Sequence, residues 1–385
     1  MSTNARLFEY IDVNPKEILT KGTLAKKISM DKLQPFCRDI PEYELAEYTG
    51  GTKFRNGDTI MARITPCLEN GKTAMVNILD ENEVGFGSTE YIVFRAKKEL
   101  TIPDFVYYLV RSSFVRELAI KSMVGSSGRQ RVQTNVVENL EIDFPSLTEQ
   151  TQIASVLKSL DDKIALNNKI NNNLEQQAKA LYKDWFFDFS PFSTEGNLPD
   201  GWHLGTVGDI IQLHDSKRVP LSGSERDKME KIYPYYGATS LMDYVDNYLF
   251  DGIYLLLGED GTVVDSLGFP ILQYVYGQFW VNNHAHIITG KEGFSVEELY
   301  LFFSLTNIKS IVTGAVQQKV SQQNLKKVPA IIPSKETLSA FDDLIQPIFA
   351  QIRNLRDENA HLADLRDTLL PRLMSGELDV SDTEI

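Results

Sequence analysis

VGSSGRQRVQTNVVENLEIDFP (residues 124–145) aligns with TGAVQQKVSQQNLKKVPAIIP (residues 313–333), so one part of the chain repeats another. The prolines that end the two stretches lie 188 residues apart in a chain of 385 residues. Upstream, TIPDFVYYL (residues 101–109) matches SVEELYLFF (residues 295–303). A spacing of nearly half the chain is too long for a solenoid repeat and indicates a tandem duplication of a whole domain.

After each of these prolines, apolar residues recur at alternating spacings of four and three. This pattern predicts a coiled-coil helix of about 40 residues in each half, or about 60 Å at about 1.5 Å per residue. Because neither helix can bury its apolar stripe alone, we expect the two to pack together in antiparallel orientation. Pro347 interrupts the second pattern and predicts a kink or a later helix start, since an interior proline costs about 3 kcal/mol.

Asparagine occupies matching places in the middle of the two stripes, at Asn171 and Asn359. A buried asparagine at such a place lowers stability but fixes the register of paired helices. The alternative is that each asparagine lies on a solvated helix face. The first stripe consists of Ile153, Leu157, Leu160, Ile164, Asn167, Asn171, Leu174, Ala178, Leu181 and Trp185. The second stripe consists of Phe341, Ile345, Ile348, Ile352, Leu355, Asn359, Leu362, Arg366, Leu369 and Leu373.

The parts of the chain before each helix contain short strand-like stretches that end at Gly, Pro, Asn and Asp turns. We therefore predict an α+β fold, with two tandem-duplicated domains of mixed α/β structure separated by a pair of long antiparallel coiled-coil helices. The expected boundaries are a first globular domain at 1–146, a first helix at 147–190, a second globular domain at 191–334, a second helix at 335–378 and an acidic tail at 379–385.

The formal net charge of −14 argues only weakly against nucleic-acid binding, because exposed charges are screened at physiological salt. The charge is also unevenly placed. Residues 118–137 and 299–335 contain no acidic residue, whereas residues 336–385 contain eleven acids and four arginines. The chain has only two cysteines, and no apolar run approaches the roughly 20 residues that span a membrane. We therefore expect a cytoplasmic protein without a membrane partner.

The sequence lacks the motifs of covalent chemistry. It contains no Gly-x-x-x-x-Gly-Lys-Ser/Thr phosphate loop, no Asn-Pro-Pro-Tyr run, no Gly-x-Ser-x-Gly elbow and no His-Glu-x-x-His pair. His284 and His286 lie two residues apart, but we expect no acid or cysteine near them. Their expected role is in the core or facing DNA rather than on a metal. We predict no catalytic residue and no metal site in this chain.

The loop before each helix is rich in side chains that hydrogen-bond to base edges. Arginine and lysine bind guanine, whereas glutamine and asparagine bind adenine. The two loops differ in sequence while the frame around them repeats, as expected if two domains read different bases. The alternative is that both loops are solvated turns. The candidate DNA-binding residues are Ser126, Ser127, Arg129, Gln130 and Arg131 in the first loop, and Gln317, Gln318, Lys319 and Gln322 in the second.

Two further clusters are candidates for DNA contact. The first consists of Lys217, Arg218, Tyr235 and Tyr236. Its charges and rings suit phosphate contact and base stacking, whereas the alternative is a set of tyrosines half-buried in a core. The second consists of Arg63 and Lys72 in ARITPCLENGK, for which phosphate contact and a structural salt bridge are both open.

The chain as a whole resembles the specificity subunit of a Type I restriction-modification enzyme. Six segments carry this resemblance, and they cover nearly the whole chain in the order of the family. They are FRNGDTIMARITPCLENGKTAMV (54–76), PSLTEQTQIASVLKSLDDKI (145–164), ALYKDWFFDFSPF (180–192), LPDGWHLGTVGDI (198–210), YPYYGAT (233–239) and LRDTLLPRLMSGEL (365–378). The second half departs from the pattern because it lacks a clear counterpart of ARITPCLENGK.

The resemblance implies a non-catalytic subunit with two target-recognition domains, each of which reads one half of a split sequence in double-stranded DNA. It also implies two spacer helices that set the gap between the halves and dock two methyltransferase subunits. Restriction (motor) subunits join through the complex. S-adenosylmethionine, ATP and Mg would be bound by these partners, and we expect no cofactor on this chain.

Other classes of protein remain open at this point. One is a coiled-coil scaffold whose globular ends bind protein rather than DNA. Another is an enzyme with an unrecognised active site. A closer alternative is a specificity subunit of a bacterial or archaeal system that modifies DNA but lacks a motor.

Overall fold

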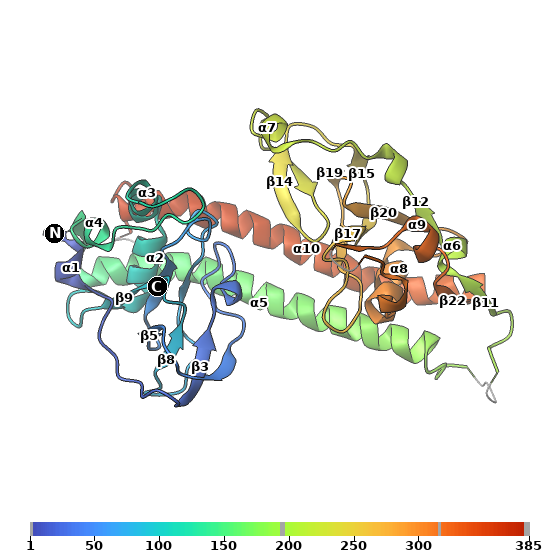
Figure 1. Cartoon of the computed structure of the whole chain (residues 1–385), viewed down its shortest axis with the longest axis horizontal. Helices are drawn as coiled ribbons and strands as arrows, with labels where there is room; N and C mark the ends of the chain where they lie inside the picture. Colours follow the sequence, from blue (N-terminus) through green and yellow to red (C-terminus); the bar gives the residue numbers. More distant parts are fainter. Residues whose placement is uncertain (1–2, 193–196, 315–316, 381–385) are drawn as a thin grey trace. The chain divides into compact units, whose positions relative to one another are not determined.

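Two helices of 40 residues, α5 (Leu147–Phe186) and α10 (Lys335–Met374), are the longest elements of the protein. The computed structural model describes residues 3–192, 197–314 and 317–380 (Figure 1). It divides into unit 1, made of Met1–Asn168 and Arg356–Ile385, and unit 2, made of Lys169–Leu355. Each unit therefore contains one globular part and a segment of both long helices.

Each long helix follows a strand, with a proline and a serine between the end of the strand and the start of the helix. The Ser146 hydroxyl accepts a hydrogen bond from the Glu149 N–H at 3.3 Å, and the Glu149 carboxylate accepts from the Ser146 N–H at 2.8 Å. This reciprocal pair is a capping box, which starts α5. At the corresponding place before α10, the Ser334 hydroxyl accepts from the Thr337 N–H at 3.2 Å.

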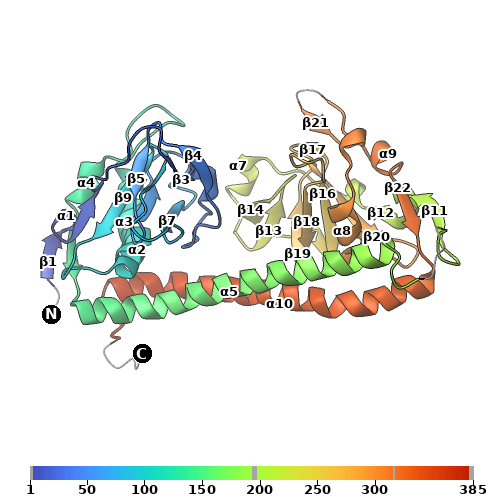
Figure 2. The same cartoon turned by 90° about the horizontal axis from the view of Figure 1, so that it is seen from below.

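Within each unit the segments of α5 and α10 lie side by side and run in opposite directions (Figures 1 and 2). In unit 1, the Asn167 amide donates to Asn359 at 2.9 Å, and the Asn359 amide donates to Asn168 at 2.8 Å. In unit 2, the rings of Tyr182 and Phe341 pack edge-on with centroids 5.6 Å apart. The predicted fold class, with duplicated domains and long antiparallel helices, is confirmed, and asparagine contacts define the helix register in unit 1.

The predicted apolar stripes are only part of the buried surface of the long helices. Leu157, Ile345 and Ile352 are buried. The half-buried stripe residues include Leu160, Ile164, Asn171, Leu174, Leu181, Ile348, Asn359, Leu362 and Leu369. Each helix also buries a second set of side chains, which the heptad pattern omits because these residues pack against the globular part of their unit. This set includes Ala154, Asp161, Tyr182, Phe186, Phe349 and Leu370.

Helix α10 continues without a break through Pro347, so the prediction of a later helix start was wrong. Pro347 and Asp343 are both exposed. The proline removes the hydrogen bond to the carbonyl of Asp343, and on an exposed face that carbonyl can turn to water instead. The position of the proline on the helix therefore makes it tolerable.

The globular part of unit 1 contains a four-stranded sheet of order β2-β9-β6-β7, a second of order β4-β3-β8-β5, and the pair β1-β10. Only the β3–β8 pair within these sheets is parallel. The strands are β1 (Thr3–Arg6), β2 (Ile11–Val13), β3 (Leu24–Ile28), β4 (Glu44–Glu47), β5 (Thr52–Phe54), β6 (Thr59–Ala62), β7 (Thr73–Met75), β8 (Gly85–Gly87), β9 (Tyr91–Ala96) and β10 (Glu141–Phe144). The helices are α1 (Leu7–Tyr10), η1 (Met30–Lys32), α2 (Pro103–Arg111), α3 (Ser113–Lys121) and α4 (Thr134–Glu138).

The globular part of unit 2 repeats this topology, with sheets of order β12-β20-β16-β18 and β14-β13-β19-β15 and the pair β11-β22. It adds the small pair β17-β21. The strands are β11 (His203–Thr206), β12 (Ile211–Leu213), β13 (Tyr233–Tyr236), β14 (Leu241–Val245), β15 (Phe250–Asp251), β16 (Tyr254–Gly258), β17 (Asp260–Gly261), β18 (Leu272–Val275), β19 (Gln278–Val281), β20 (Ala285–Gly290), β21 (Gln318–Lys319) and β22 (Pro329–Ile332). The helices are α6 (Val207–Ile210), η2 (Asp215–Lys217), α7 (Gly223–Arg226), α8 (Val296–Leu305), η3 (Lys309–Ile311) and α9 (Gln322–Leu325).

Backbone hydrogen bonds identify corresponding positions in the two globular parts. Directly after β6, the Arg63 N–H donates to the Glu90 carbonyl at 2.9 Å. Directly after β16, the Glu259 N–H donates to the His284 carbonyl at 2.8 Å. Arg63 and Glu259 therefore occupy the same place in the duplicated fold, with opposite charges.

The second half does have a structural counterpart of ARITPCLENGK, so its apparent absence from the sequence was misleading. The Ala62 N–H donates to the Lys72 carbonyl at 2.9 Å, and the Gly258 N–H donates to the Ile271 carbonyl at 3.2 Å. The counterpart thus begins at Gly258 and includes Ile271 where the first half has Lys72. The sequence match failed because the segment is longer and its charged residues differ.

Unit 1 joins its globular part to the long helices through buried polar groups. Arg366 of α10 donates to Asp161 of α5 at 2.6 Å, and the Tyr108 hydroxyl of α2 donates to the other Asp161 oxygen at 2.7 Å. The side chains of Arg366 and Asp161 are each 5% exposed. In unit 2 the residues at the places of Arg366, Asp161 and Tyr108 are Ala178, Phe349 and Phe302. Unit 2 is therefore apolar at these places, and its buried polar contact between the globular part and α10 lies elsewhere, where Arg353 donates to Glu297 at 3.0 Å.

No helix among the described residues is both long enough and apolar enough to cross a bilayer. Of the predicted acidic tail at 379–385, residues 381–385 lie outside the described residues.

Candidate nucleic-acid interface

The predicted DNA-reading loop of unit 1 is attached to the segment that follows β6. The Val132 N–H donates to the Arg63 carbonyl at 2.9 Å, and the Thr65 N–H donates to the Gln130 carbonyl at 3.1 Å. Before these attachments the loop turns at Gly125 and Gly128, which both have positive φ, and Gln130 is half-buried. Its exposed candidate residues are Ser126, Ser127, Arg129 and Arg131.

Arg131 is held in place by Glu90. Its Nη2 lies 2.7 Å from Glu90 Oε1, and its Nε lies 3.0 Å from Oε2. The Arg131 side chain nevertheless keeps 45% of its surface exposed. A bidentate carboxylate orients the planar guanidinium group, and the exposed edge can meet another acceptor. The sequence alignment gave no sign of Glu90 as the partner.

Arg63 and Lys72 are both half-buried and use their side chains within the globular part of unit 1. Arg63 Nη2 donates to the Val132 carbonyl at 3.1 Å, and the Lys72 ammonium donates to the Met30 carbonyl at 2.8 Å. The structure therefore does not bring them together as a phosphate-binding pair. Neither residue has a carboxylate partner among the described residues, so the alternative of a salt bridge is not observed there either.

In unit 2 the predicted loop pairs with the segment that follows β16. Strand β21 carries Gln318 and Lys319 and pairs with β17, where Lys319 lies opposite Asp260. Gln317 and Lys319 are exposed, and Gln318 is half-buried. The Lys319 ammonium lies 3.4 Å from Glu259 Oε1, so it is oriented by an acid as Arg131 is in unit 1.

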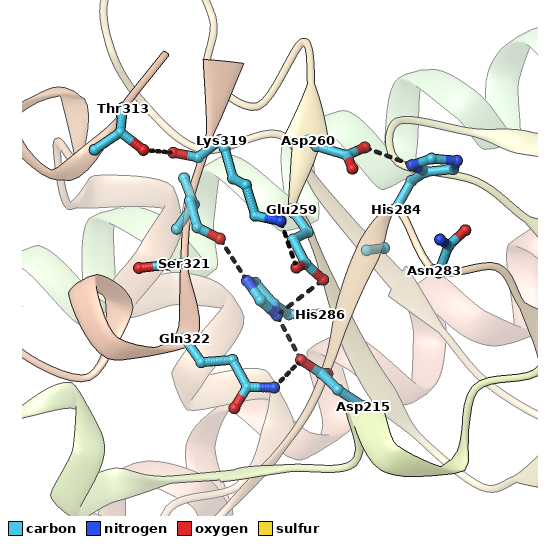
Figure 3. A network of polar contacts seen from close by, with 12 residues as sticks. Asp215, Glu259, Asp260, Asn283, His284, His286, Thr313, Lys319, Ser321 and Gln322 are labelled. Atoms are coloured by element: carbon cyan, nitrogen blue, oxygen red, sulfur yellow. Dashed lines mark hydrogen bonds and ion pairs between the residues drawn. The ribbon is translucent and has the colours of Figure 1, made fainter. Parts of the chain in front are cut away.

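A network of buried polar groups lies beneath this loop (Figure 3). The Asp215 carboxylate accepts from the Gln322 amide at 2.6 Å and from the Ile287 N–H at 3.0 Å, and it lies 2.6 Å from His286 Nδ1. Burial disfavours the charge of Asp215, but the hydrogen bond and charge of His286 lower the pKa of this carboxyl below its ordinary value. Gln322 therefore anchors its loop to Asp215 instead of extending its amide freely toward a base.

His286 connects the same network to the backbone of the loop. Its Nε2 lies 2.8 Å from the Val320 carbonyl, which can only accept, so Nε2 carries a hydrogen. Its Nδ1 faces Asp215 at 2.6 Å and Glu259 at 3.7 Å. Both ring nitrogens therefore face hydrogen-bond acceptors of the same unit. This buried contact fixes the strand that presents Lys319.

The prediction that no acid lies near the two histidines was wrong. His284 Nδ1 lies 2.5 Å from Asp260, and His286 lies beside Asp215 and Glu259 (Figure 3). Periodicity could not reveal these acids because they come from other strands and loops of the sheet. His284 and His286 also differ in burial, since the side chains are 45% and 0% exposed, so they do not form a common face.

Asp215, Glu259 and His286 place ligand-type atoms within 4.8 Å of one another. Two further cations already contact these acids. Arg218 lies 2.6 Å from Glu259 and 3.6 Å from Asp215, and Lys319 lies 3.4 Å from Glu259. Because these side chains balance the carboxylate charge, we interpret the cluster as a structural ion network of the loop rather than as a metal centre.

The cluster of Lys217, Arg218, Tyr235 and Tyr236 is not one surface. Lys217 is exposed, but Arg218 donates to the Asn283 and Ala285 carbonyls at 3.3 and 2.7 Å in addition to Glu259. Tyr235 is only 1% exposed, so the prediction that its ring can stack on bases was wrong. Its hydroxyl accepts from the Leu221 N–H at 3.0 Å, which places the ring in the core. Tyr236 is half-buried, with its ring edge-on to Phe279.

The sequence matches the family described as the Type I restriction modification DNA specificity domain twice, over residues 10–176 and 199–360. The chain belongs to this family. The two matches cover the two globular parts and most of the long helix that follows each. This family is one of non-catalytic DNA-recognition subunits, and the membership confirms the resemblance drawn from the six sequence segments.

Two relatives named as specificity subunits align along most of their length. The specificity subunit of the Type I restriction enzyme MjaIX of Methanocaldococcus jannaschii is 26% identical over 319 residues, which cover 74% of this chain and 71% of that protein. The HindI specificity subunit of Haemophilus influenzae is 24% identical and covers 84% of this chain and 87% of its own. The crystal structure of an S subunit of a Type I restriction-modification system from M. genitalium has the same fold, with a TM-score of 0.54, 18% identity, and coverage of 97% of this chain and 96% of that one.

Proposed function

We propose that this chain reads a bipartite target in double-stranded DNA, with one half read by each globular part. The observation that carries the proposal is the pair of loops at corresponding places in a duplicated fold. Arg131 and Lys319 occupy the same position, each is oriented by an acid, and each side chain is about half exposed, at 45% and 52%. Because the residues around these two cations differ in sequence, the two loops are suited to different base sequences.

The exposed loop residues are the proposed contacts with bases and nearby phosphates. These are Ser126, Ser127, Arg129 and Arg131 in unit 1, and Gln317 and Lys319 in unit 2. Gln130 and Gln318 are half-buried, and Gln322 anchors its loop through Asp215. We assign these three residues to loop positioning rather than to direct reading of bases.

We further propose that the long helices dock two methyltransferase subunits and that restriction subunits join through the resulting complex. The acidic composition of residues 336–385 supports a protein partner for this part of the chain, since DNA would be repelled by it. S-adenosylmethionine, ATP and Mg belong to the partner subunits in this scheme. The complex acts on DNA in the cytoplasm of a bacterial or archaeal cell.

Methylation mapping tests the proposal directly. The chain is co-expressed with its neighbouring methyltransferase in a host that lacks other methylation, and the whole genome is sequenced with detection of modified bases. We expect a split motif that is absent when the methyltransferase is expressed alone. A stable complex that yields no motif would contradict the proposal and favour a protein scaffold.

A second experiment separates a complete restriction system from one that only modifies DNA. Both would give the same methylation motif. Only a complete system lowers the plating efficiency of a phage that carries unmodified copies of that motif.

A further inference from the structure

A polar cavity of about 570 Å³ opens on the globular part of unit 1. Its walls come from the segment after β2, the start of β5, the segment after β6 and the start of β9, and include Lys16, Glu17, Lys53, Arg63 and Tyr91. Arg63 links this cavity to the proposed DNA-reading loop, because its carbonyl accepts from the Val132 N–H at 2.9 Å. The cavity therefore borders the loop that carries Arg131.

The cavity has an excess of positive charge. Three cations, Lys16, Lys53 and Arg63, line it, and among the described residues no carboxylate lies within ion-pair distance of any of them. The one acid in the wall, Glu17, lies 2.7 Å from Arg55 and 2.7 Å from Arg95. Burial opposes the charge of Glu17, but these two arginines lower its pKa. Its charge is therefore already compensated outside the cavity.

Arg63 also has an unused donor. Its Nη2 donates to the Val132 carbonyl, but its Nε is buried and has no hydrogen-bond partner among the described residues. This N–H is shielded from solvent, so it does not itself reach a ligand, and the cavity offers an anion the ammonium groups of Lys16 and Lys53 together with the charge of Arg63.

The duplicated fold provides an internal comparison. In unit 2 the place of Arg63 is taken by Glu259, which contacts Arg218 at 2.6 Å and Lys319 at 3.4 Å. The acid at this position is thus neutralised by cations of the same unit, whereas Arg63 has no such counterion among the described residues. At this position unit 1 therefore offers a positive charge to an outside anion, whereas unit 2 has an acid whose charge is already balanced.

We propose that this cavity binds neighbouring phosphate groups of the DNA backbone, next to the bases that the unit 1 loop reads. The inference rests on the proposed function and adds a site to it. Phosphate oxygens are anionic acceptors, and lysines at the rim with an arginine in the wall are the groups that bind them in protein–DNA complexes. The corresponding place in unit 2, with Glu259, does not bind phosphate. The two halves of the target are therefore held by different electrostatic means.

The test uses the chain in complex with its methyltransferase subunits and a fluorescent duplex that carries the methylation motif. Binding is measured by anisotropy from 50 to 200 mM salt for the native complex and for Lys16→Ala/Lys53→Ala. The slope of log K against log salt is negative, and each lost lysine–phosphate contact makes it less steep by about 1. We therefore expect the slope of the double variant to be less steep by about 2. The native complex then loses about 16-fold more affinity than the variant over this fourfold rise in salt.

Lys98→Ala/Lys121→Ala is the matched control, because it removes two exposed lysines from the same globular part but away from the cavity. We expect this control to change the slope far less, and we expect Lys16→Ala/Lys53→Ala to weaken binding to duplexes with and without the motif by a similar factor. Thermal melting of both variants checks that unit 1 remains folded.

A slope equal to that of the native complex would overturn the proposal. So would a loss confined to duplexes with the motif, because that result would make the lysines base contacts. Inorganic phosphate is tested separately. If it raises the melting temperature of the native chain but not of the variant while the DNA slope is unchanged, the site binds free phosphate and the proposal of DNA backbone contact fails. Methylation mapping separates the two possible failures. If the slope of the double variant equals that of the native complex but the native complex still produces a split methylation motif, the phosphate site fails while the proposed function stands.

Discussion

Replacement of Arg366 by alanine should strongly destabilise unit 1. Arg366 contacts Asp161 at 2.6 Å, with both side chains 5% exposed, and its Nε donates to Asp367 at 2.8 Å. Burial opposes the charge of Arg366, but Asp367 and Asp161 raise its pKa above the ordinary value, so the guanidinium group stays charged throughout the physiological range. Without the guanidinium group, the one side-chain hydrogen bond left to Asp161 within the described residues is that from Tyr108.

Removal of one partner from a buried ion pair costs about 3–5 kcal/mol, because the other charge is left without compensation in a poorly polarisable environment. The loss of Arg366 costs less at Asp367, since this carboxylate is half exposed and also accepts a hydrogen bond from Arg111 at 2.8 Å. For a unit of this size, about 3–5 kcal/mol corresponds to a fall of about 6–20 °C in the melting temperature. We expect Arg366→Ala to lie within this range.

Arg372→Ala is the control, since it removes an arginine from the same helix whose pair with Glu377 is 2.8 Å long but exposed. An exposed pair contributes about 0–1 kcal/mol, so this variant should melt close to the native protein. Denaturant unfolding and thermal melting of the full chain, followed by circular dichroism, measure both variants.

Unit 2 suggests a repair. Its residues at the places of Arg366, Asp161 and Tyr108 are Ala178, Phe349 and Phe302, so Tyr108→Phe/Asp161→Phe/Arg366→Ala gives unit 1 the apolar side chains that unit 2 has there. A well-packed apolar replacement of a buried ion pair is often neutral or stabilising, and we expect the triple variant to recover most of the loss. A single variant that costs less than about 1 kcal/mol, or a triple variant as unstable as the single one, would refute this account.

Three further results should follow. Insertion of one heptad after Asn168 together with a matching heptad before Arg356 lengthens the helices by about 10 Å, near three base pairs, so the methylation motif should gain unread positions in its gap while both half-sites stay unchanged. Arg131→Ala and Lys319→Ala should each relax the motif in one half only, by about 1–3 kcal/mol per lost bidentate contact, whereas equal weakening on all sequences would mark the residue as a phosphate contact. Burial raises the pKa of Glu298 to about 8, so folded unit 2 keeps a proton that the unfolded chain releases above about pH 4.3, and stability should fall as pH rises between these values. Glu298→Gln should flatten that fall in denaturation experiments at pH 5, 6.5 and 8, and an unchanged pH profile would show that Glu298 is ionised in the folded protein.

The duplication and the long helices could be predicted because both are local or strictly periodic signals. The offset of 188 residues placed matching helices after Pro145 and Pro333, and α5 and α10 begin at Leu147 and Lys335. A heptad pattern describes one contact face, however. It could not show that the face bearing Asp161 packs against a globular part as well.

The surroundings of the loops could not be predicted in the same way. Asp215 and His286 are 71 residues apart, and they meet because β12, which leads into Asp215 of η2, pairs with β20, which carries His286. Tyr235 looked suitable for stacking because the residue type alone does not show whether a tyrosine ring lies in the core or on the surface. The candidates in the 124–133 loop remain predictions, and their exposure is what makes them testable.

The division of the chain into units has a consequence for its synthesis. Unit 1 needs residues 356–380 to complete its helix pair and cover side chains such as Ile153 and Leu157, yet the whole of unit 2 is translated in between. At about 5–20 residues per second, the ribosome takes roughly 10–40 s to cross that interval. During this time the apolar face of the first half of α5 is not yet covered by the segment of α10 that packs against it. The nascent protein is therefore a natural client for a chaperone that recognises exposed helix faces, and its yield should depend on how fast the second half is made.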